Sequence, residues 1–168
     1  VIAMKREEYN YGSEVFQYDF LNPETESPFF EGTDNVLPLS VKKILKEGAE
    51  SGKRLVFLIN PPYATAGING KKGTSKEGVA KTIANEEMKK AKLGSCSQQL
   101  YTQFLFQCER VASEYGFKSK SVGVFSPPLI ITSGSFSKFR PYWYSRYNYK
   151  SGFMFQARSE ERRVGKEC

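Results

Sequence analysis

The sequence predicts an α/β fold with a mostly parallel sheet. Two runs, Arg54 to Ile59 and Ser121 to Phe125, are apolar without alternation, which is typical of strands buried on both faces. A helical pattern that begins at Ser97 separates them. Strands that alternate with helices favour parallel pairing. A chain of 168 residues suits one domain with a core of its own.

The N-terminal part should contain one strand, one loop and one helix. Polar and apolar residues alternate from Glu14 to Asp19, which predicts a strand that ends before the turn signal Asn22-Pro23. Residues 22–38 contain three prolines and should form a loop. A helix should follow, capped by Ser40 and ended by Gly52. Its expected apolar face consists of Val41, Ile44, Leu45, Gly48 and Ala49.

The C-terminal part should contain two helices and two strands. A short helix is expected around Asn85 to Leu93, and a strongly amphipathic helix should run from Ser97 to Gly116. The apolar stripe of the second helix is Leu100, Tyr101, Phe104, Leu105, Cys108, Val111, Ala112 and Tyr115. The stretch from Ser135 to Tyr149 is aromatic and basic; we favour core packing for its rings over stacking on nucleic-acid bases. Gly152 to Gln156 should be a final strand.

The composition excludes several kinds of functional site. The chain has no histidine, which excludes histidine-based acid–base catalysis, Ser-His-Asp and Cys-His nucleophiles, and histidine metal ligands. Cys96 and Cys108 are isolated and Cys168 is the last residue, so we expect neither a metal site nor a disulfide framework. The longest apolar run, Leu55 to Ile59, is too short to cross a bilayer. A cytoplasmic enzyme or nucleic-acid binder without a membrane partner is therefore expected.

The tetrapeptide Asn60-Pro61-Pro62-Tyr63 directly follows the most apolar predicted strand. Ligand sites of parallel α/β sheets lie at the carboxyl ends of the strands. In this place the tetrapeptide resembles the signature of S-adenosylmethionine-dependent amino methyltransferases, chiefly those that methylate adenine N6 in DNA. The resemblance implies a Rossmann-like methyltransferase sheet, S-adenosylmethionine as cofactor, DNA as partner and a role in restriction–modification. The simpler interpretation is a Pro-Pro turn that closes a strand.

The residue types of the tetrapeptide suit transfer of a methyl group to an exocyclic amine. The side-chain oxygen of Asn60 and the carbonyl of Pro61 can accept the two N–H groups of the amine and stabilise the positive charge that develops on its nitrogen. Pro61 and Pro62 fix the backbone and provide no competing N–H. Tyr63 offers a flat face to a base that has left the helical stack. These four residues are the candidate catalytic residues.

A second segment, Tyr18-Asp19-Phe20-Leu21, is similar to the cofactor-binding pattern of the same family. The resemblance implies that Asp19 accepts the adenine amine of S-adenosylmethionine and that Phe20 packs against the adenine ring. The alternative is that Asp19 only caps a turn.

We interpret residues 1–157 as a partial methyltransferase domain and residues 158–168 as a tail that does not belong to it. The tail reads RSEERRVGKEC, which fits the back-translation of a common sequencing adapter; a genuine polar tail is the alternative. Nothing from Val1 to Gly12 matches the glycine-rich cofactor loop of the family, and its later base-holding motif would follow Gln156. We therefore expect an incomplete sheet that lacks its first strand, and a chain that is inactive by itself. The missing strand should leave a split sheet or a non-native pairing.

Three functions stay open. The first is DNA adenine-N6 methylation. The second is methylation of protein glutamine at N5, since enzymes of that kind carry the same tetrapeptide. The third is a non-catalytic, basic nucleic-acid-binding module. Residues 64–94 form a lysine-rich insert, either a contact for DNA phosphates or a solvated loop, and the net charge of +7 favours a nucleic acid. The target sequence and the oligomeric state are not predicted.

Overall fold

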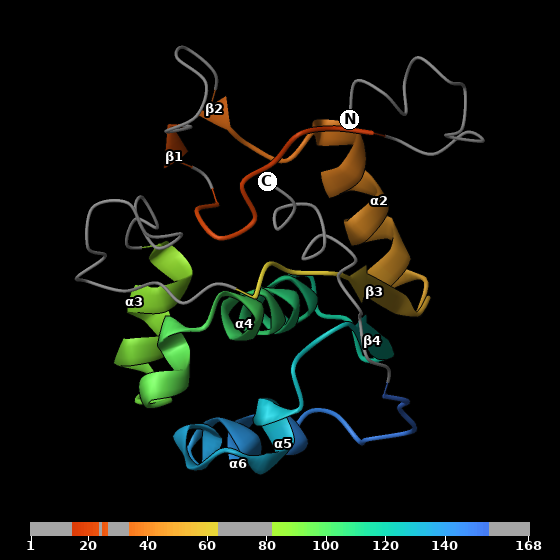
Figure 1. Ribbon diagram of the computed structural model, residues 1–168. Helices are drawn as coiled ribbons and strands as arrows, with labels where there is room; N and C mark the ends of the chain where they lie inside the picture. Colours follow the sequence, from red (N-terminus) through yellow and green to blue (C-terminus); the bar gives the residue numbers. More distant parts are fainter. Residues whose placement is uncertain (1–14, 24, 27–33, 64–81, 155–168) are drawn as a thin grey trace, which may run out of the picture.

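The computed structural model describes residues 15–23, 25–26, 34–63 and 82–154 (Figure 1). These residues form a mixed α/β structure. Its elements, in chain order, are β1 (Thr25–Glu26), β2 (Asp34–Asn35), α2 (Leu39–Glu50), β3 (Leu55–Ile59), α3 (Ile83–Lys90), η1 (Ser95–Gln98), α4 (Leu100–Glu114), β4 (Lys120–Val124), α5 (Leu129–Thr132), η2 (Gly134–Phe136) and α6 (Phe139–Tyr144). Within the described ranges, no helix has the length and apolar character that a bilayer span requires.

Strands β3 and β4 form a parallel pair, with Leu55 opposite Lys120 and Ile59 opposite Val124. The chain crosses from β3 to β4 through α3, η1 and α4, as a parallel connection requires. Strands β1 and β2 form a separate antiparallel pair of two residues each inside the expected loop. The α/β class and the parallel pairing are confirmed, and the described strands are split between two sheets.

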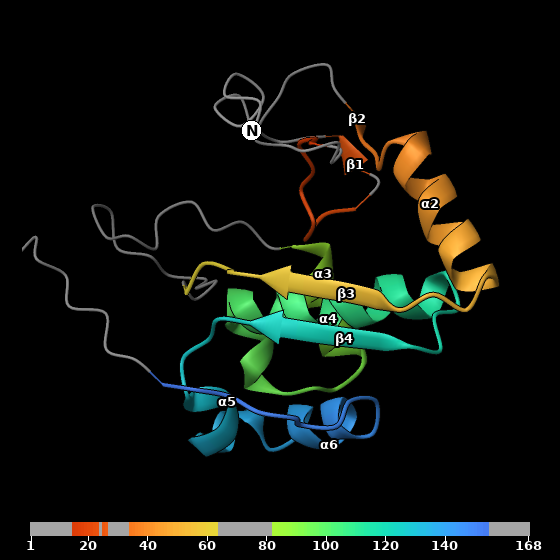
Figure 2. The ribbon, with the colours of Figure 1, turned by 90° about the vertical axis from the view of Figure 1, so that its right-hand side faces the viewer.

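The strand predicted from Glu14 to Asp19 is wrong for residues 15–19, which join no sheet; Glu14 lies outside the described residues. This segment passes above α4, beyond the free edge of β3 (Figures 1 and 2). Val15, Phe16 and Tyr18 are half-buried there. The alternating pattern therefore belongs to a segment that has no neighbouring described strand to complete a ladder.

Helix α2 begins earlier than expected. Its N-cap is Pro38, which makes no side-chain cap hydrogen bond, so the assignment of the cap to Ser40 is wrong. The fixed φ of proline suits the start of a helix without help from a side chain. The predicted end is confirmed, since Gly52 adopts a φ of +68° just after the helix. Gly48 is buried against Phe117, whereas Ile44 is mostly exposed, so the apolar face of α2 is only partly covered.

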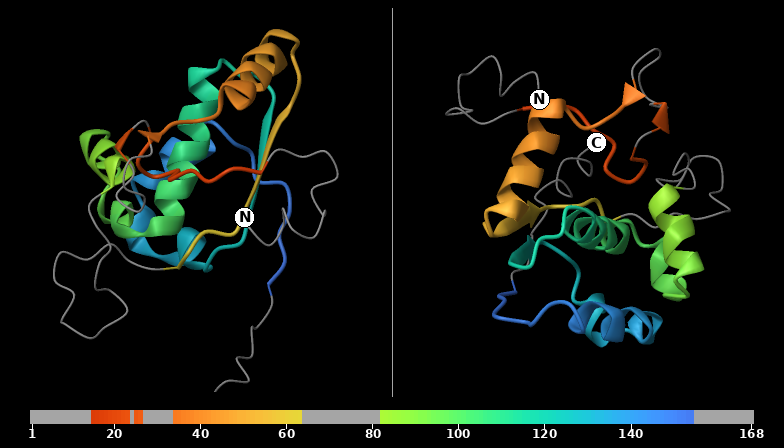
Figure 3. Two further views of the ribbon diagram at one scale, coloured as in Figure 1. Left: turned by 90° about the horizontal axis from the view of Figure 1, so that it is seen from above. Right: turned by 180° about the vertical axis from the view of Figure 1, so that it is seen from behind.

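The core lies between α4, the sheet, and the segment that contains η2 and α6. Its buried members are Met88, Leu93, Cys96, Tyr101, Leu105, Phe106, Phe136 and Phe139. Ile59, Val122 and Val124 of the sheet pack against this cluster. Helix α4 runs through the middle of the molecule in the views from above and behind (Figure 3), and Gly116, at a φ of +77°, follows its C-cap as predicted. The aromatic residues Phe136 and Phe139 belong to the core, as expected.

Two predictions about strands are wrong in part. In β3, Val56 is 63% exposed and Leu58 is 79% exposed, because the helices cover one face of the sheet only (Figure 2). The strand expected from Gly152 to Gln156 is absent over residues 152–154, where Phe153 and Met154 are exposed. Residues 155 and 156 lie outside the described residues, as do the tail 158–168, the N-terminal residues 1–14 and residues 64–81 of the lysine-rich insert.

Candidate functional site

The carboxyl ends of β3 and β4 lie at the same edge of the sheet (Figure 2). The backbone N–H of Phe125 donates to the carbonyl of Ile59 at 3.1 Å, which holds the two chains together just past the last pair of the ladder. Asn60 therefore leaves β3 beside the point where residues 125 and 126 leave β4. The sequence predicted this placement, and it is the usual place for a ligand in a parallel sheet.

Three residues of the tetrapeptide are exposed at this edge. Asn60 and Pro62 are exposed, Tyr63 is 54% exposed, and Pro61 is buried. The hydroxyl of Tyr63 donates to the Oδ1 atom of Asn60 at 3.3 Å. A side-chain amide oxygen has two lone pairs, so Asn60 can accept a further N–H while this bond persists. The four predicted catalytic residues thus form one short segment at this edge, exposed except for Pro61.

Asp19 is engaged in a turn of its own. Its Oδ1 atom accepts the backbone N–H of Leu21 at 3.1 Å, and its Oδ2 atom accepts the side-chain amide of Asn22 at 2.8 Å. This is the turn-capping arrangement that the sequence left open as the alternative for Asp19. Both carboxylate oxygens already have a donor within the protein.

The side chain of Asn35 also holds this turn, through three hydrogen bonds. Its Oδ1 atom accepts the backbone N–H of Asp19 at 2.7 Å, and its Nδ2 atom donates to the carbonyl oxygens of Asp19 and Asn22. Asn35 is buried, and its two partner residues, Asp19 and Asn22, lie 16 and 13 residues earlier in the chain. Sequence reasoning missed this residue, because an asparagine before a proline-containing stretch reads as an ordinary loop residue.

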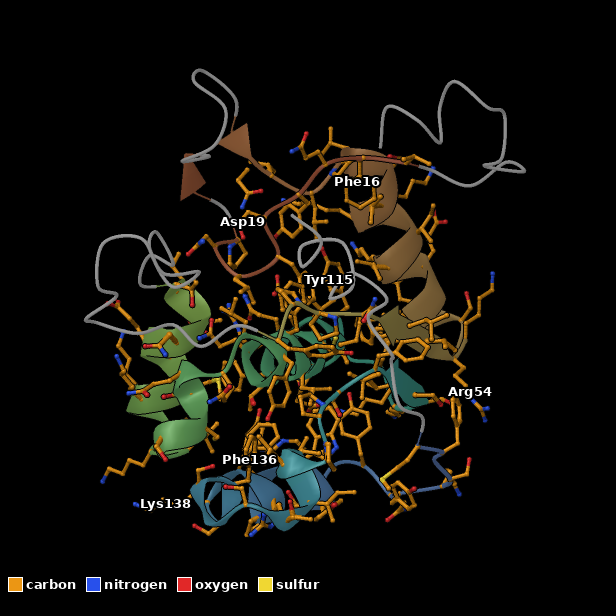
Figure 4. The ribbon with its side chains drawn as sticks, viewed as in Figure 1. Phe16, Asp19, Arg54, Tyr115, Phe136 and Lys138 are labelled. Atoms are coloured by element: carbon orange, nitrogen blue, oxygen red, sulfur yellow. The ribbon has the colours of Figure 1, made fainter. Side chains whose placement is uncertain are left out.

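The turn that Asp19 stabilises is attached to α3 and not to the tetrapeptide. The Oδ1 atom of Asn22 accepts the N–H of Ile83 at 3.0 Å, and the carbonyl of Leu21 accepts the N–H of Ala84 at 3.1 Å. These bonds occupy N–H groups at the start of α3 that have no partner within the helix. Asp19 lies above α3 and α4 in Figure 4.

Phe20 packs onto α4. Its ring centroid lies 5.8 Å from that of Phe104 and 6.4 Å from that of Tyr18. Its carbonyl accepts the side-chain amide of Gln107 at 3.0 Å. The ring is therefore half-buried against the helix, and the described geometry gives Asp19 and Phe20 roles in the fold.

A part-buried ion pair joins α4 to β4 at the end of the strand away from the tetrapeptide. The Nζ atom of Lys120, the first residue of β4, donates to both carboxylate oxygens of Glu109 at 2.8 and 2.7 Å. Ser113 donates to the same carboxylate at 2.9 Å, and Arg146 lies 3.6 Å away. Burial raises the pKa of Glu109, but the hydrogen bonds from Lys120 and Ser113 outweigh it and hold the pKa below its usual value. No sequence spacing could have revealed this pair, because it joins different elements.

The two cysteines of the described residues, Cys96 and Cys108, offer no alternative nucleophile. Burial raises the pKa of the Cys96 thiol to about 11 and that of Cys108 to about 12. Both thiols stay protonated at neutral pH, and a thiol is a much weaker nucleophile than a thiolate.

Comparisons of the chain with family models, with curated proteins and with solved structures found no match.

Proposed function

We propose that the chain is part of an S-adenosylmethionine-dependent methyltransferase that acts on the N6 amine of adenine in DNA. The supporting observation is the position of Asn60-Pro61-Pro62-Tyr63 at the carboxyl end of β3 in a parallel pair. Asn60 and Tyr63 face solvent there, and Pro61 is buried. A Pro-Pro turn that only closed a strand would not require an exposed acceptor and an exposed ring side by side.

The residues of the chain act on the amine. The Oδ1 atom of Asn60 and the carbonyl of Pro61 accept its two N–H groups and draw its nitrogen toward tetrahedral geometry. The nitrogen lone pair then becomes available for bond formation, and the positive charge that develops is stabilised by both oxygens. Tyr63 stacks on the extruded base and holds it at the edge of the sheet. The surplus proton leaves to water, since the chain has no histidine to receive it.

S-adenosylmethionine, when bound, supplies a methyl group on a positively charged sulfur. The two residues that the sequence assigned to its adenine do not fit this role as placed, because Asp19 binds its own turn and Phe20 packs on α4. The proposal therefore depends only on the residues assigned to the amine and its base, which are Asn60, Pro61 and Tyr63.

The test is methyl transfer from labelled S-adenosylmethionine to three samples: duplex DNA, a glutamine-containing peptide, and buffer. The assay is run on the 168-residue chain and on a version extended upstream in its natural reading frame. The proposal expects label in the N6-methyladenine of the DNA for the extended version. Label in the peptide alone supports glutamine methylation, and no transfer to either sample in both versions rejects the chemistry.

A further inference from the structure

Four lysines gather where α3 ends. Lys89 and Lys90 lie in the last turn of the helix, and Lys92 follows in the turn toward η1. Lys138 comes from a distant part of the chain, just before α6, and its side chain lies across Gly94: a Cβ atom at Gly94 would be 3.5 Å from Cδ of Lys138. Figure 4 shows Lys138 beside the lower end of α3. All four lysines are exposed, and we call them the lysine cluster.

The backbone under the lysine cluster is anchored in the core. The N–H of Leu93 donates to the carbonyl of Met88 at 3.1 Å, and the N–H of Lys92 donates to the carbonyl of Lys89 at 2.9 Å. Leu93 and Met88 are both buried. Lys92 has a φ of +57°, in the left-handed region that glycine usually occupies after a helix. The chain thus keeps a lysine at a position where glycine is favoured.

The positive charge of the lysine cluster is not balanced by ion pairs with the described acidic residues. Glu87 of α3 is bound to Arg110 of α4. Glu86 is exposed on the first turn of α3, and within the described ranges no ion pair joins it, or any other acid, to the cluster. Lysines at a helix C-terminus often only complement the helix dipole. That explanation covers Lys89 and Lys90, but not Lys138.

We infer that the lysine cluster binds the phosphate backbone of double-stranded DNA. Such binding is electrostatic and independent of sequence, and it positions a duplex without reading it. The carboxyl edge of β3 and β4 faces the viewer in Figure 1, and α3 lies on its left flank. No large apolar side chain is exposed on the described residues of α3 and η1, which disfavours a lipid surface, since peripheral membrane binding needs buried apolar area as well as charge. The inference rests on the proposed function, because DNA is the substrate proposed there.

The test is the salt dependence of binding to a short, fluorescently labelled duplex, measured by anisotropy without cofactor. One variant of the 168-residue chain carries Lys89→Gln, Lys90→Gln, Lys92→Gln and Lys138→Gln. A matched control carries Lys43→Gln, Lys46→Gln, Lys53→Gln and Lys118→Gln, which removes the same charge from exposed lysines elsewhere. The slope of log K against log salt should fall by about 0.9 for each phosphate contact that is lost, so by up to about 3 to 4 in the cluster variant, and much less in the control.

Three results would overturn the inference. They are equal losses in the two variants, wild-type binding by the cluster variant, and stronger binding of the wild-type chain to anionic vesicles than to the duplex. If the cluster variant melts without cooperativity, the pair Lys90→Gln and Lys138→Gln carries the same test with half the expected change of slope. Binding through the cluster without methyl transfer by the extended version rejects the proposed function and leaves the inference intact. Methyl transfer to DNA by the extended version, together with unchanged DNA binding by the cluster variant, supports the proposed function and rejects the inference.

Discussion

At the scale of single residues, Asn60 and Tyr63 are joined by a hydrogen bond across the tetrapeptide, while Pro61 is buried. Asn60 and Tyr63 have different tasks in the proposed reaction. Asn60 provides an oxygen, and Tyr63 provides a ring and a hydroxyl that orients this oxygen. Substitutions can separate these contributions.

Asn60→Ala should lower methyl transfer by the extended enzyme about 100- to 1000-fold, which is the usual loss when a preorganised acceptor or donor is removed. Tyr63→Phe removes only the hydroxyl and should cost less than about tenfold, whereas Tyr63→Ala also removes the ring. Asn148→Ala, at an exposed asparagine outside the site, is the control. Initial rates with labelled cofactor are the measurement. Turnover near wild type for Asn60→Ala would contradict the assignment.

The sequence allowed two roles for Asp19, which were cofactor binding and turn capping. In the structure its carboxylate caps the turn. Asp19→Ala removes the acceptor for the N–H of Leu21 and for the amide of Asn22, and should lower the free energy of unfolding by about 1 kcal/mol. Asp19→Asn keeps one acceptor and should cost less. Thermal and urea denaturation measure both. Melting of Asp19→Ala at the wild-type temperature would show that the turn does not depend on this carboxylate.

At the scale of elements, the sequence predicted helices better than strands. The apolar stripe of α4, with its glycine stop at Gly116, was identified because eight positions share one helical face and depend on no partner outside the helix. A strand needs a neighbour that the sequence does not show. For this reason the alternation of polar and apolar residues over 15–19 wrongly predicted a strand. The continuous apolar run of β3 likewise predicted burial on both faces, whereas one face is exposed.

In the candidate site, too, some residues could be predicted from the sequence and others could not. The tetrapeptide was placed correctly because it is contiguous and directly follows β3. Asn35 and the pair of Glu109 and Lys120 could not be predicted, since each depends on contacts between elements that only the folded chain brings together. A lone polar residue carries no sequence signal of the partner that it will meet.

The ion pair of Glu109 and Lys120 connects α4 to β4 and makes the stability depend on pH. Because the pKa of Glu109 is lowered in the folded chain, its contribution is complete above the unfolded value of about 4.3 and is lost as the pH falls through the folded value. Glu109→Gln should lower the free energy of unfolding at pH 7 by roughly 1–3 kcal/mol and flatten its decline in acid. Glu47→Gln, in an exposed pair with Lys43 at 3.8 Å, is the control and should change little. Equal acid profiles for Glu109→Gln and wild type would refute this role.

At the scale of the whole molecule, the described helices cover one face of the β3–β4 pair and leave its other face open (Figure 2). Leu58 lies over Gly123 on the open face, where a Cβ atom at Gly123 would be only 3.0 Å from Leu58 Cδ1. Val56 stands beside it on the same face of β3. The described strands give β3 no partner on its outer edge. Apolar side chains next to an unpaired strand edge favour pairing with another chain.

We therefore expect the 168-residue chain to bind a hydrophobic dye and to self-associate as its concentration rises. Leu58→Lys should reduce both effects, because a charge on the open face opposes edge-to-edge pairing. It should leave the melting temperature nearly unchanged, since Leu58 is 79% exposed and loses little buried area. Leu129→Lys, at a half-exposed position on α5, removes a similar side chain away from this face and is the control. Sedimentation velocity and dye fluorescence over a concentration series measure the outcome. A wild-type chain that stays monomeric and dye-free throughout would mean that the open face and edge of β3 are covered in solution.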